Sequence, residues 1–560
     1  MGFLPFLQWK HYYPITDFYT EWLAACLGLL ALFFSFRRLD RLPLIALIPL
    51  SLIPVVWLQH TLGLIAYPQQ AFLISLYLLW AALIAMLGHA LKNEFGPGKV
   101  AEVLAWFILA GGLLNSFCAI FQHYHIGTVF DAFVTPDSAE TVYGNLAQQN
   151  HFSDYTALGL ASLLYLASKE RMPWYFPVPF ALFMLFTLAL SGSRSAWVFL
   201  GAMALLSILF YRKERKLLYG SLLLVPVFGI MQFAAHLSFL DPNHATTSAD
   251  RLLVIARDSG IRLYLWREAW LMFLKAPVLG VGFGQFAWHH FGYGPLFRNP
   301  AITGLYSNSH DIVLNFLAET GLMGSLLVFG GLFFWARRIG ISSDIHAWWL
   351  IACLSILFLH SLDEYPLWYA HFLGLFMLFL GMGESRALRL PFARGAVAFL
   401  LISGSYMTTG LMRDYLDLEG LLYPRYHNGK PPLKPAALYA GLQQFRKGTL
   451  LAPYVDYSLA KMLPMDGKDL ERKLELCERA AHFSPSGIVL YRYAALLALA
   501  GREREAEIEV ERSASSDPDL LQEAFELYSG LAEKHPDEFL PLVGEVVMKL
   551  KEQDLAFRHQ

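Results

Sequence analysis

The chain is poor in charge and in cysteine. Charged residues make up 16% of its 560 positions, whereas a soluble protein would contain about 25%. Only four cysteines are present, three of them in apolar runs, which excludes a disulfide framework and a cysteine-rich metal cluster. The net charge of −2 gives no reason to expect a nucleic-acid partner. The opening residues also lack the basic and apolar regions of a cleavable signal peptide.

Apolar residues are abundant instead. They make up 56% of the chain, and the mean hydropathy is +0.43. Stretches of about 17 to 22 apolar residues, long enough to span a bilayer, recur up to residue 411. They lie near 18–36, 43–58, 70–90, 100–122, 152–168, 174–190, 195–211, 217–236, 311–335, 346–361, 365–383 and 394–411. The sequence therefore predicts an all-α, polytopic membrane protein with about twelve transmembrane helices.

Basic residues indicate how the chain is oriented. Lys and Arg gather in alternate loops, at residues 37–41, 92–99, 169–171, 212–216, 337–338 and 386–394. The loops between them are nearly bare, and the turn 191–194 contains only Arg194. Because basic loops stay in the cytoplasm, both termini and the long loop 237–310 are expected outside. A first helix that begins outside without a signal is hard to insert, so we expect either a missing upstream helix or a remnant of one in residues 1–7.

Beyond residue 411 the composition changes. Charge rises, long apolar runs stop, and helical patterns appear between prolines. Residues 490–518 have the pattern of a helical hairpin, and Ala494, Ala506 and Pro518 have the spacing of a tetratricopeptide repeat. We therefore predict a transmembrane catalytic domain over 1–411 and an outer, helical, TPR-like domain over 412–560. A generic helical bundle is the alternative for the second domain.

Five polar stretches fall on the outer face: 143–151, 191–197, 261–273, the start of the ninth span at His310, and 360–369. Ionisable groups at a membrane boundary are costly and mark functional sites. Arg194 and Arg262 could bind an anion, since a guanidinium fits phosphate oxygens. Alternatively, Arg194 reaches lipid phosphates, and Arg262 forms the polar side of an amphipathic helix on the membrane surface. The glycine-rich run 275–286 permits tight turns or close backbone approach to a ligand.

His310 is the candidate for proton chemistry, because an imidazole titrates near neutrality and can deprotonate a hydroxyl. Asp311 could compensate charge, or could serve as an N-terminal residue of the following helix. Asn315 and Glu319 share a helix face, and polar packing between helices explains them best. The carboxylates at 363–364 are either site residues or ordinary loop residues.

Two arginines and a histidine at the lipid level fit a particular reaction, the transfer of a sugar from a polyprenyl diphosphate to a hydroxyl. The arginines would bind the diphosphate and take over the electrostatic role of a metal ion. No metal-ligand set and no nucleotide-binding domain are apparent in the sequence, and no cofactor is expected. A transporter with an outer charged gate is the alternative, although internal repeats and a polar path across the membrane are not evident.

These residues carry a resemblance. The stretch 310–324 resembles the motif of the O-antigen ligase and O-antigen polymerase superfamily: His, a small polar residue, nine residues, Gly, two residues, Gly. Asp311 departs from it, because the family usually has Asn, Ser or Gln there. The stretches GNLAQQNH (144–151), SGSR (191–194) and HSLDEYPLWY (360–369) are similar to the PglL-type protein O-oligosaccharyltransferases of bacteria.

The resemblance implies metal-independent, inverting transfer of an oligosaccharide from undecaprenyl diphosphate to Ser or Thr of an exported protein such as pilin. It places this activity at the periplasmic face of a Gram-negative inner membrane. His310 would be the base, and Arg194 and Arg262 would bind the diphosphate. Donor or acceptor binding is expected of four further residues, which are Asn150, His151, Asp311 and Glu364. An O-antigen ligase acting on lipid A core, or a Wzy-type polymerase, is the alternative within the superfamily.

Overall fold

The computed structural model describes residues 2–136, 141–211, 214–237, 247–248, 255–297, 304–339, 344–389 and 393–558. Helices dominate it, and the strands in these ranges are β1 (Arg41–Pro43) and β2 (Ala387–Arg389), which pair antiparallel. The first helices are α1 (Phe18–Ser35), α2 (Leu47–Thr61), α3 (Pro68–Phe95), α4 (Pro97–Tyr124), α5 (Gln149–Ser168), α6 (Pro177–Leu190), α7 (Ser195–Phe210), α8 (Arg215–Ala234), α10 (Ile255–Lys275) and α11 (Phe286–Phe297). Then follow α12 (Ile312–Ser325), a π-helical turn (Leu326–Gly330), α13 (Gly331–Arg338), α14 (Ile345–Ser361), α15 (Ala370–Gly383), α16 (Ala393–Leu422), α17 (Pro424–Asn428), α18 (Pro435–Phe445), α19 (Ala452–Ala460), α20 (Leu470–Phe483), α21 (Ile488–Leu499), α22 (Glu503–Ser516), α23 (Leu521–Ala532) and α24 (Pro536–Arg558).

Each of the twelve predicted spans overlaps a helix or a helical run, and the eleventh, 365–383, comprises a 3-10 turn (Pro366–Trp368) followed by α15. The ninth, for example, is formed by α12, the π-helical turn and α13. Seven helical segments of the described chain are long and apolar enough to cross a membrane, and further apolar helices, α6, α7, α14 and α15 among them, have 10–17 residues. The predicted all-α, polytopic membrane fold is thereby confirmed.

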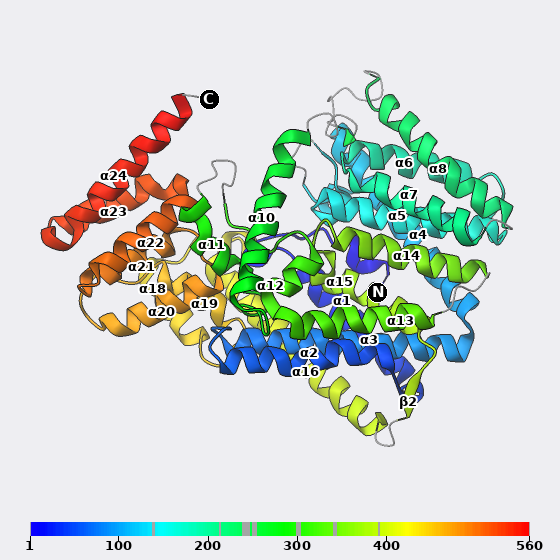
Figure 1. Ribbon diagram of the computed structural model, residues 1–560, viewed down its shortest axis with the longest axis horizontal. Helices are drawn as coiled ribbons and strands as arrows, with labels where there is room; N and C mark the ends of the chain where they lie inside the picture. Colours follow the sequence, from blue (N-terminus) through cyan, green and yellow to red (C-terminus); the bar gives the residue numbers. More distant parts are fainter. Residues whose placement is uncertain are drawn as a thin grey trace.

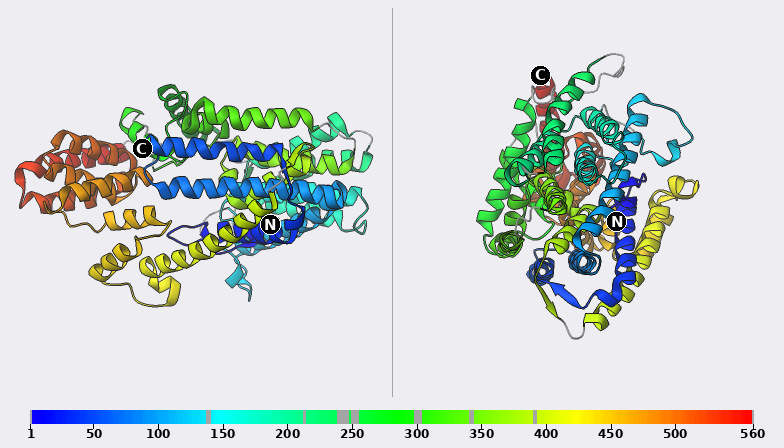
Figure 2. Two further views of the ribbon diagram at one scale, coloured as in Figure 1. Left: turned by 90° about the horizontal axis from the view of Figure 1, so that it is seen from below. Right: turned by 90° about the vertical axis from the view of Figure 1, so that its right-hand side faces the viewer.

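Long helices run side by side through the middle of the molecule, as Figure 2 shows for α3, α2 and the α12–α13 run, with α2 between the other two. Helices α4 to α8 gather at one end, and the C-terminal helices, drawn in orange and red, lie at the other end (Figure 1). Glycines allow close contact inside the bundle. A Cβ on Gly88 of α3 would lie 2.1 Å from the carbonyl oxygen of Leu378, and one on Gly381 of α15 would lie 2.1 Å from that of Ala85. Small residues permit such approach between membrane helices.

The glycine-rich run 275–286 packs against α12. Gly280 has φ +71, and a Cβ there would lie 2.3 Å from the carbonyl carbon of Glu319. Gly321, at φ +60, kinks α12 at the same place, and a Cβ on it would lie 2.5 Å from the Val278 backbone. Backbone N–H groups then bond across the contact, from Val281 to the Ala318 carbonyl and from Leu322 to the Pro277 carbonyl. The sequence suggested that this glycine-rich run makes tight turns or approaches a ligand closely. In the structure, the close approach is to the backbone of α12.

Helix α10 contains the predicted amphipathic stretch 261–273. Its buried residues Leu265, Ala269 and Met272 pack in one cluster with Ala318 of α12. The sequence suggested that the apolar face of this helix lies on the membrane surface. In the structure, other parts of the protein cover this part of the face, while Trp270 remains 47% exposed.

The C-terminal region is helical, as predicted, and residues 490–518 form the hairpin α21–α22. Helix α16 passes through residue 411 without a break, so the predicted domain boundary falls inside a helix, and the division itself stays a prediction. The C-terminal helices have their own buried core, which includes Tyr491 and Tyr528. They also contact the long loop, because Trp288 of α11 stacks on His482 of α20 with ring centroids 4.0 Å apart.

Candidate active site

His310 lies one residue before the N-cap of α12, in a strained conformation. Its φ is +55, which is uncommon for a residue other than glycine and is often found at functional sites. Its N–H donates to Asn308 Oδ1 at 3.1 Å. The carboxylate of Asp311 accepts from the Leu314 N–H at 2.8 Å and caps the helix. Of the two roles considered for Asp311, the structure therefore favours the helix-terminal one, and its role in binding stays a prediction.

Glu364 holds the His310 ring. His310 Nδ1 lies 2.9 Å from Glu364 Oε2, and only 8% of the Glu364 side chain is exposed. Burial would raise the pKa of Glu364, but the hydrogen bond from His310 and the charges of His310, His360 and Arg262 hold this pKa below its ordinary value. The ionised carboxylate accepts a hydrogen bond from Nδ1–H, which leaves Nε2 as the ring nitrogen able to take a proton from a substrate.

Arg262 reaches the same turn from α10. Its Nη1 forms an ion pair with Asp363, and its Nη2 lies 3.5 Å from Glu364 Oε1. The Arg262 side chain is 27% exposed and that of Asp363 is 39% exposed, so the pair borders solvent. A bound anion would compete with these carboxylates for the guanidinium, because diphosphate oxygens offer it the same fork geometry.

Asn150 and the turn around Arg194 complete the network. Asn150 Nδ2 donates to Glu364 Oε1 at 3.0 Å, and Asn150 Oδ1 accepts from Ser193 Oγ at 2.8 Å. On the other side of Arg194, Ser195 Oγ donates to Asp363 Oδ2 at 3.1 Å. Both neighbours of Arg194 are therefore bonded to the cluster that holds His310 and Arg262.

His151 lies in a buried aromatic layer beside this network. It is 6% exposed, and its ring centroid lies 4.8 Å from that of Tyr369 and 5.2 Å from that of Phe372. His360 lies in the same layer, where its Nδ1 is 2.7 Å from Asp154 Oδ2 and both side chains are fully buried. The carbonyl of His360 accepts from the amides of residues 363 and 364, so this layer anchors the acidic turn. The binding role expected of His151 stays a prediction.

Sequence reasoning missed several members of the network. Ser193, Ser195 and Asn308 had no assigned role, and Asp363 was considered only as one of two carboxylates that could be ordinary loop residues. The one signal for Ser193, Ser195 and Asp363 was that they lie in the polar stretches 191–197 and 360–369.

An apolar cavity of about 300 Å³ lies next to the site. Ile312 and Phe316, on the first turns of α12, contribute to its lining together with Leu367, Trp368 and Tyr77. His310 therefore stands between a polar cluster and an apolar space. That combination suits a ligand with a charged head and a hydrocarbon tail.

Comparison with known proteins identifies the family. A model described as "O-Antigen ligase" matches residues 179–329, which include Arg194, Arg262 and His310. One described as "Protein glycosylation ligase" matches residues 142–167, which include Asn150 and His151. The chain belongs to the PglL-type branch of the O-antigen ligase superfamily. A third model, "Virulence factor membrane-bound polymerase, C-terminal", matches residues 348–514.

Two relatives of this PglL-type chain come from Acinetobacter baylyi. A "General O-oligosaccharyltransferase" is 30% identical over 394 residues, or 66% of each chain. A "ComP-specific O-oligosaccharyltransferase" is 24% identical over 334 residues, or 58% of each chain. The match thus spans 66% of the first relative's length and 58% of the second's. As in the superfamily, the chain is a multi-pass membrane protein.

Proposed function

We propose that this protein transfers an oligosaccharide en bloc from undecaprenyl diphosphate to Ser or Thr of exported proteins such as pilin. The reaction takes place at the periplasmic face of a Gram-negative inner membrane. The observation that carries the proposal is the hydrogen bond between His310 Nδ1 and Glu364. It presents Nε2 as a base beside two arginine-bearing elements, as glycosyl transfer to a hydroxyl requires.

In the proposed reaction, His310 Nε2 takes the proton of the acceptor hydroxyl. The acceptor oxygen then attacks the anomeric carbon of the glycan, and the bond from that carbon to the diphosphate oxygen breaks. Undecaprenyl diphosphate leaves with the bonding electrons, and Arg194 and Arg262 stabilise the charge that develops on it. The proton on His310 passes to solvent, and the base is regenerated for the next turnover.

Two further observations support a lipid-linked donor and a protein acceptor. The apolar cavity that begins at Ile312 offers space for the first isoprene units once the diphosphate lies between the arginines. Both relatives are named O-oligosaccharyltransferases, and one of them is named as specific for ComP. Asn150 and Glu364 would then order the site, and His151 would act from the aromatic layer behind it.

The test is in vitro transfer with the purified protein. Undecaprenyl-diphosphate oligosaccharide and a pilin acceptor are mixed with it in the presence of EDTA, and the intact mass of the acceptor is measured. We expect a gain equal to the whole glycan, abolished in His310→Ala. His346→Ala is the matched control, because that histidine lies at the start of α14, remote from the site. Full transfer by the His310 variant would overturn the assignment of the base.

The second candidate is ligation to lipid A core, or chain growth on the lipid donor. Two observations favour it, since the models that match residues 179–329 and 348–514 carry the descriptions of a ligase and a polymerase. The same assay separates the candidates when lipid A core is supplied in place of pilin. Transfer to core sugar, or a lengthened lipid donor, with an unchanged pilin mass would establish the second candidate.

A further inference from the structure

A large polar cavity lies at the end of the helix bundle remote from His310. The α12–α13 run leads from Ile312 to Arg338, which at 1.5 Å per residue is about 40 Å. Arg338 Nη2 there lies 3.1 Å from Glu384 Oε2. The residues that follow Glu384 line a cavity of about 840 Å³, which β1 and β2 border. None of the described residues that line this cavity takes part in the site around His310.

The cavity is rich in arginine. Its lining includes Arg37, Arg38, Arg41 and Arg386, and among the described lining residues Asp40 and Glu94 are the acids that oppose them. One of the acids is engaged, because Arg38 Nη2 lies 3.2 Å from Glu94 Oε1. The excess positive charge is therefore about two, concentrated in a concave space. Guanidinium groups gathered in this way bind phosphate oxygens well.

A second, apolar cavity of about 240 Å³ lies farther along α3, the helix that lines both cavities. Leu29 of α1, Leu83 of α3 and Leu400 of α16 are part of its lining. On α3, Leu83 lies six residues before His89 of the arginine-rich cavity, which is about 9 Å along the helix. A molecule with its head among the arginines could therefore place a hydrocarbon chain in this second cavity.

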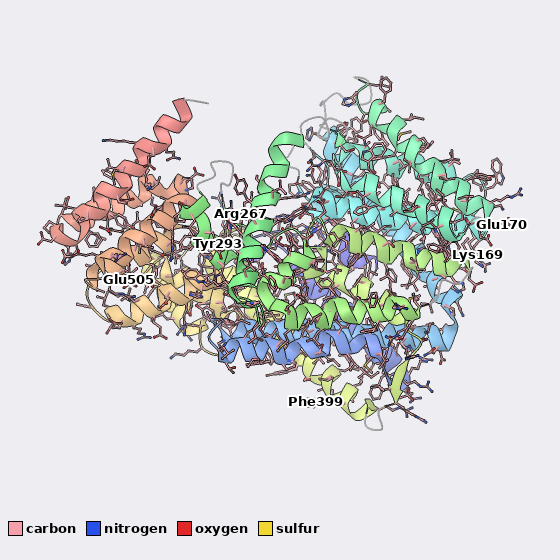
Figure 3. All side chains as sticks on the ribbon, in the orientation of Figure 1. Lys169, Glu170, Arg267, Tyr293, Phe399 and Glu505 are labelled. Carbon is pink, nitrogen blue, oxygen red and sulfur yellow. The ribbon has the colours of Figure 1, made fainter. Side chains whose placement is uncertain are left out.

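Helix α16 is the outer wall, and its free face is apolar. Phe399 is 70% exposed, Ile402 73% and Tyr406 81%. Figure 3 labels Phe399 on α16, at the edge of the molecule. A face of this kind borders lipid in a membrane protein, so lipid lies directly outside the wall of the apolar cavity.

We infer that these two cavities form a binding site for an anionic membrane phospholipid, whose head-group cavity is remote from the proposed transfer site. The phosphodiester head binds among Arg37, Arg41 and Arg386, and an acyl chain lies between α1, α3 and α16. Free phosphate shares the chemistry of the head but has no chain for the apolar cavity. The site belongs to the membrane face where the basic loops lie, and anionic lipids are recognised by basic pockets between helices there.

The experiment measures lipid retention by native mass spectrometry on the full-length protein, mixed with cardiolipin or with phosphatidylethanolamine. The test variant is Arg37→Gln/Arg41→Gln/Arg386→Gln. The matched control removes as much charge from other basic loops, as Lys169→Gln/Arg171→Gln/Arg215→Gln, and Figure 3 shows Lys169 in a different corner of the molecule. We expect cardiolipin retention to fall at least about tenfold in the test variant, with little change in the control.

Three outcomes would overturn the inference. Equal loss in both triple variants would mean that overall charge attracts the lipid. Equal retention of the two lipids by the unchanged protein would exclude recognition of the head. Displacement of cardiolipin by inorganic phosphate would make this a site for the free ion.

If the triple variant does not fold, a second measurement still tests the inference. A photoactivatable cardiolipin is crosslinked to the unchanged protein, and the modified peptides are identified. Crosslinks from the head at 37–41 or 385–388 support the inference, and crosslinks confined to other segments contradict it. Neither measurement depends on transfer activity, so the inference can fail or hold independently of the proposed function.

Discussion

Glu364 stands at the centre of the candidate site at the scale of single residues. One of its carboxylate oxygens contacts His310, and the other contacts Asn150 and Arg262. A carboxylate in this position fixes the ring orientation and stabilises the positive charge that the ring acquires when it takes a proton. We infer that Glu364 acts on the reaction through His310 and is a positioning residue.

Replacing Glu364 by Gln tests this role. The amide keeps the size of the side chain but cannot stabilise a protonated His310, so we expect kcat to fall about 100-fold. The acceptor KM should change little, because Glu364 is not proposed to bind acceptor in this role. Steady-state transfer kinetics measure both values. Glu364→Asp, which keeps the charge, should recover part of kcat, and a Gln variant with unchanged kcat would contradict the role.

Arg262→Lys tests the arginine fork. Lysine keeps the charge but cannot contact two oxygens in the fixed geometry of a guanidinium. A hydrogen bond to a charged group contributes about 1.5–3 kcal/mol, so we expect kcat/KM for the lipid donor to fall about tenfold or more. Arg267→Lys in the same helix is the matched control and should leave this value unchanged. Equal effects in the two variants would show that α10 is merely perturbed.

Sequence analysis identified many of these residues but not their contacts. His310 and Glu364 are 54 positions apart, and Arg262 and Asp363 are 101 positions apart. No periodic pattern connects residues at such distances. Charge in an otherwise bare outer loop indicated which residues matter, whereas the pairing of Glu364 with His310 depends on how α10, α12 and α14 pack.

Helices were the easier scale to predict, because an apolar run long enough to span a bilayer has few other structures available. Interruptions inside such runs were harder. The kink of α12 at Gly321 and the π-helical turn after Ser325 lie within one apolar stretch. The glycines of the superfamily motif were visible in the sequence, but their cause was not. For Gly321 the cause is the backbone of residues 277–282 lying against α12, whereas a Cβ on Gly324 would meet the side chain of Thr320.

Gly321→Ala tests the kink. An alanine there would have φ +60 and a Cβ 2.5 Å from the Val278 backbone, so we expect a loss of about 2 kcal/mol or more of stability. Transfer activity should fall with it, because the kink holds α12 against the loop from α10. Gly330→Ala is the matched control, since nothing lies within 4 Å of a Cβ there. The melting temperature in detergent and the transfer activity are measured for both variants. Equal melting temperatures of the Gly321 and Gly330 variants would contradict this account.

At the scale of the whole molecule, two of the contacts between the C-terminal helices and the membrane part involve charged, polar or aromatic side chains. Tyr67, before α3, donates to Asp456 of α19, and Arg446 and Arg479 pair with the same buried carboxylate. In the second contact, Trp288 of α11 stacks on His482. Because α10 and α11 belong to the same loop, the C-terminal helices contact the loop that also contains Arg262. We expect this docking to influence how the site is ordered.

The docking of α11 on α20 should depend on pH. Burial lowers the pKa of His289 to about 4, assisted by the charges of Lys275 and His482, and burial lowers the pKa of His482 to about 4. In the unfolded chain a histidine titrates near 6.5. Between pH 6.5 and about pH 4, these histidines are protonated in the unfolded state but remain neutral in the docked state. The contact is therefore fully stable above pH 6.5 and weakens as pH falls toward 4, by up to about 3 kcal/mol for each histidine.

Hydrogen exchange of residues 286–297 and 470–483, followed between pH 7 and pH 4 after correction for the intrinsic exchange rate, measures this weakening. We expect His482→Gln to lose about half of the pH dependence, because one of the two titrating rings is gone. His535→Gln is the matched control, since His535 has 41% of its side chain exposed and should leave the slope unchanged. The slope is the deciding quantity. In this variant the lost stack on Trp288 shifts stability equally at every pH, whereas the loss of the titrating ring changes how stability varies with pH. A His482 variant with the full slope would assign the pH dependence to other groups.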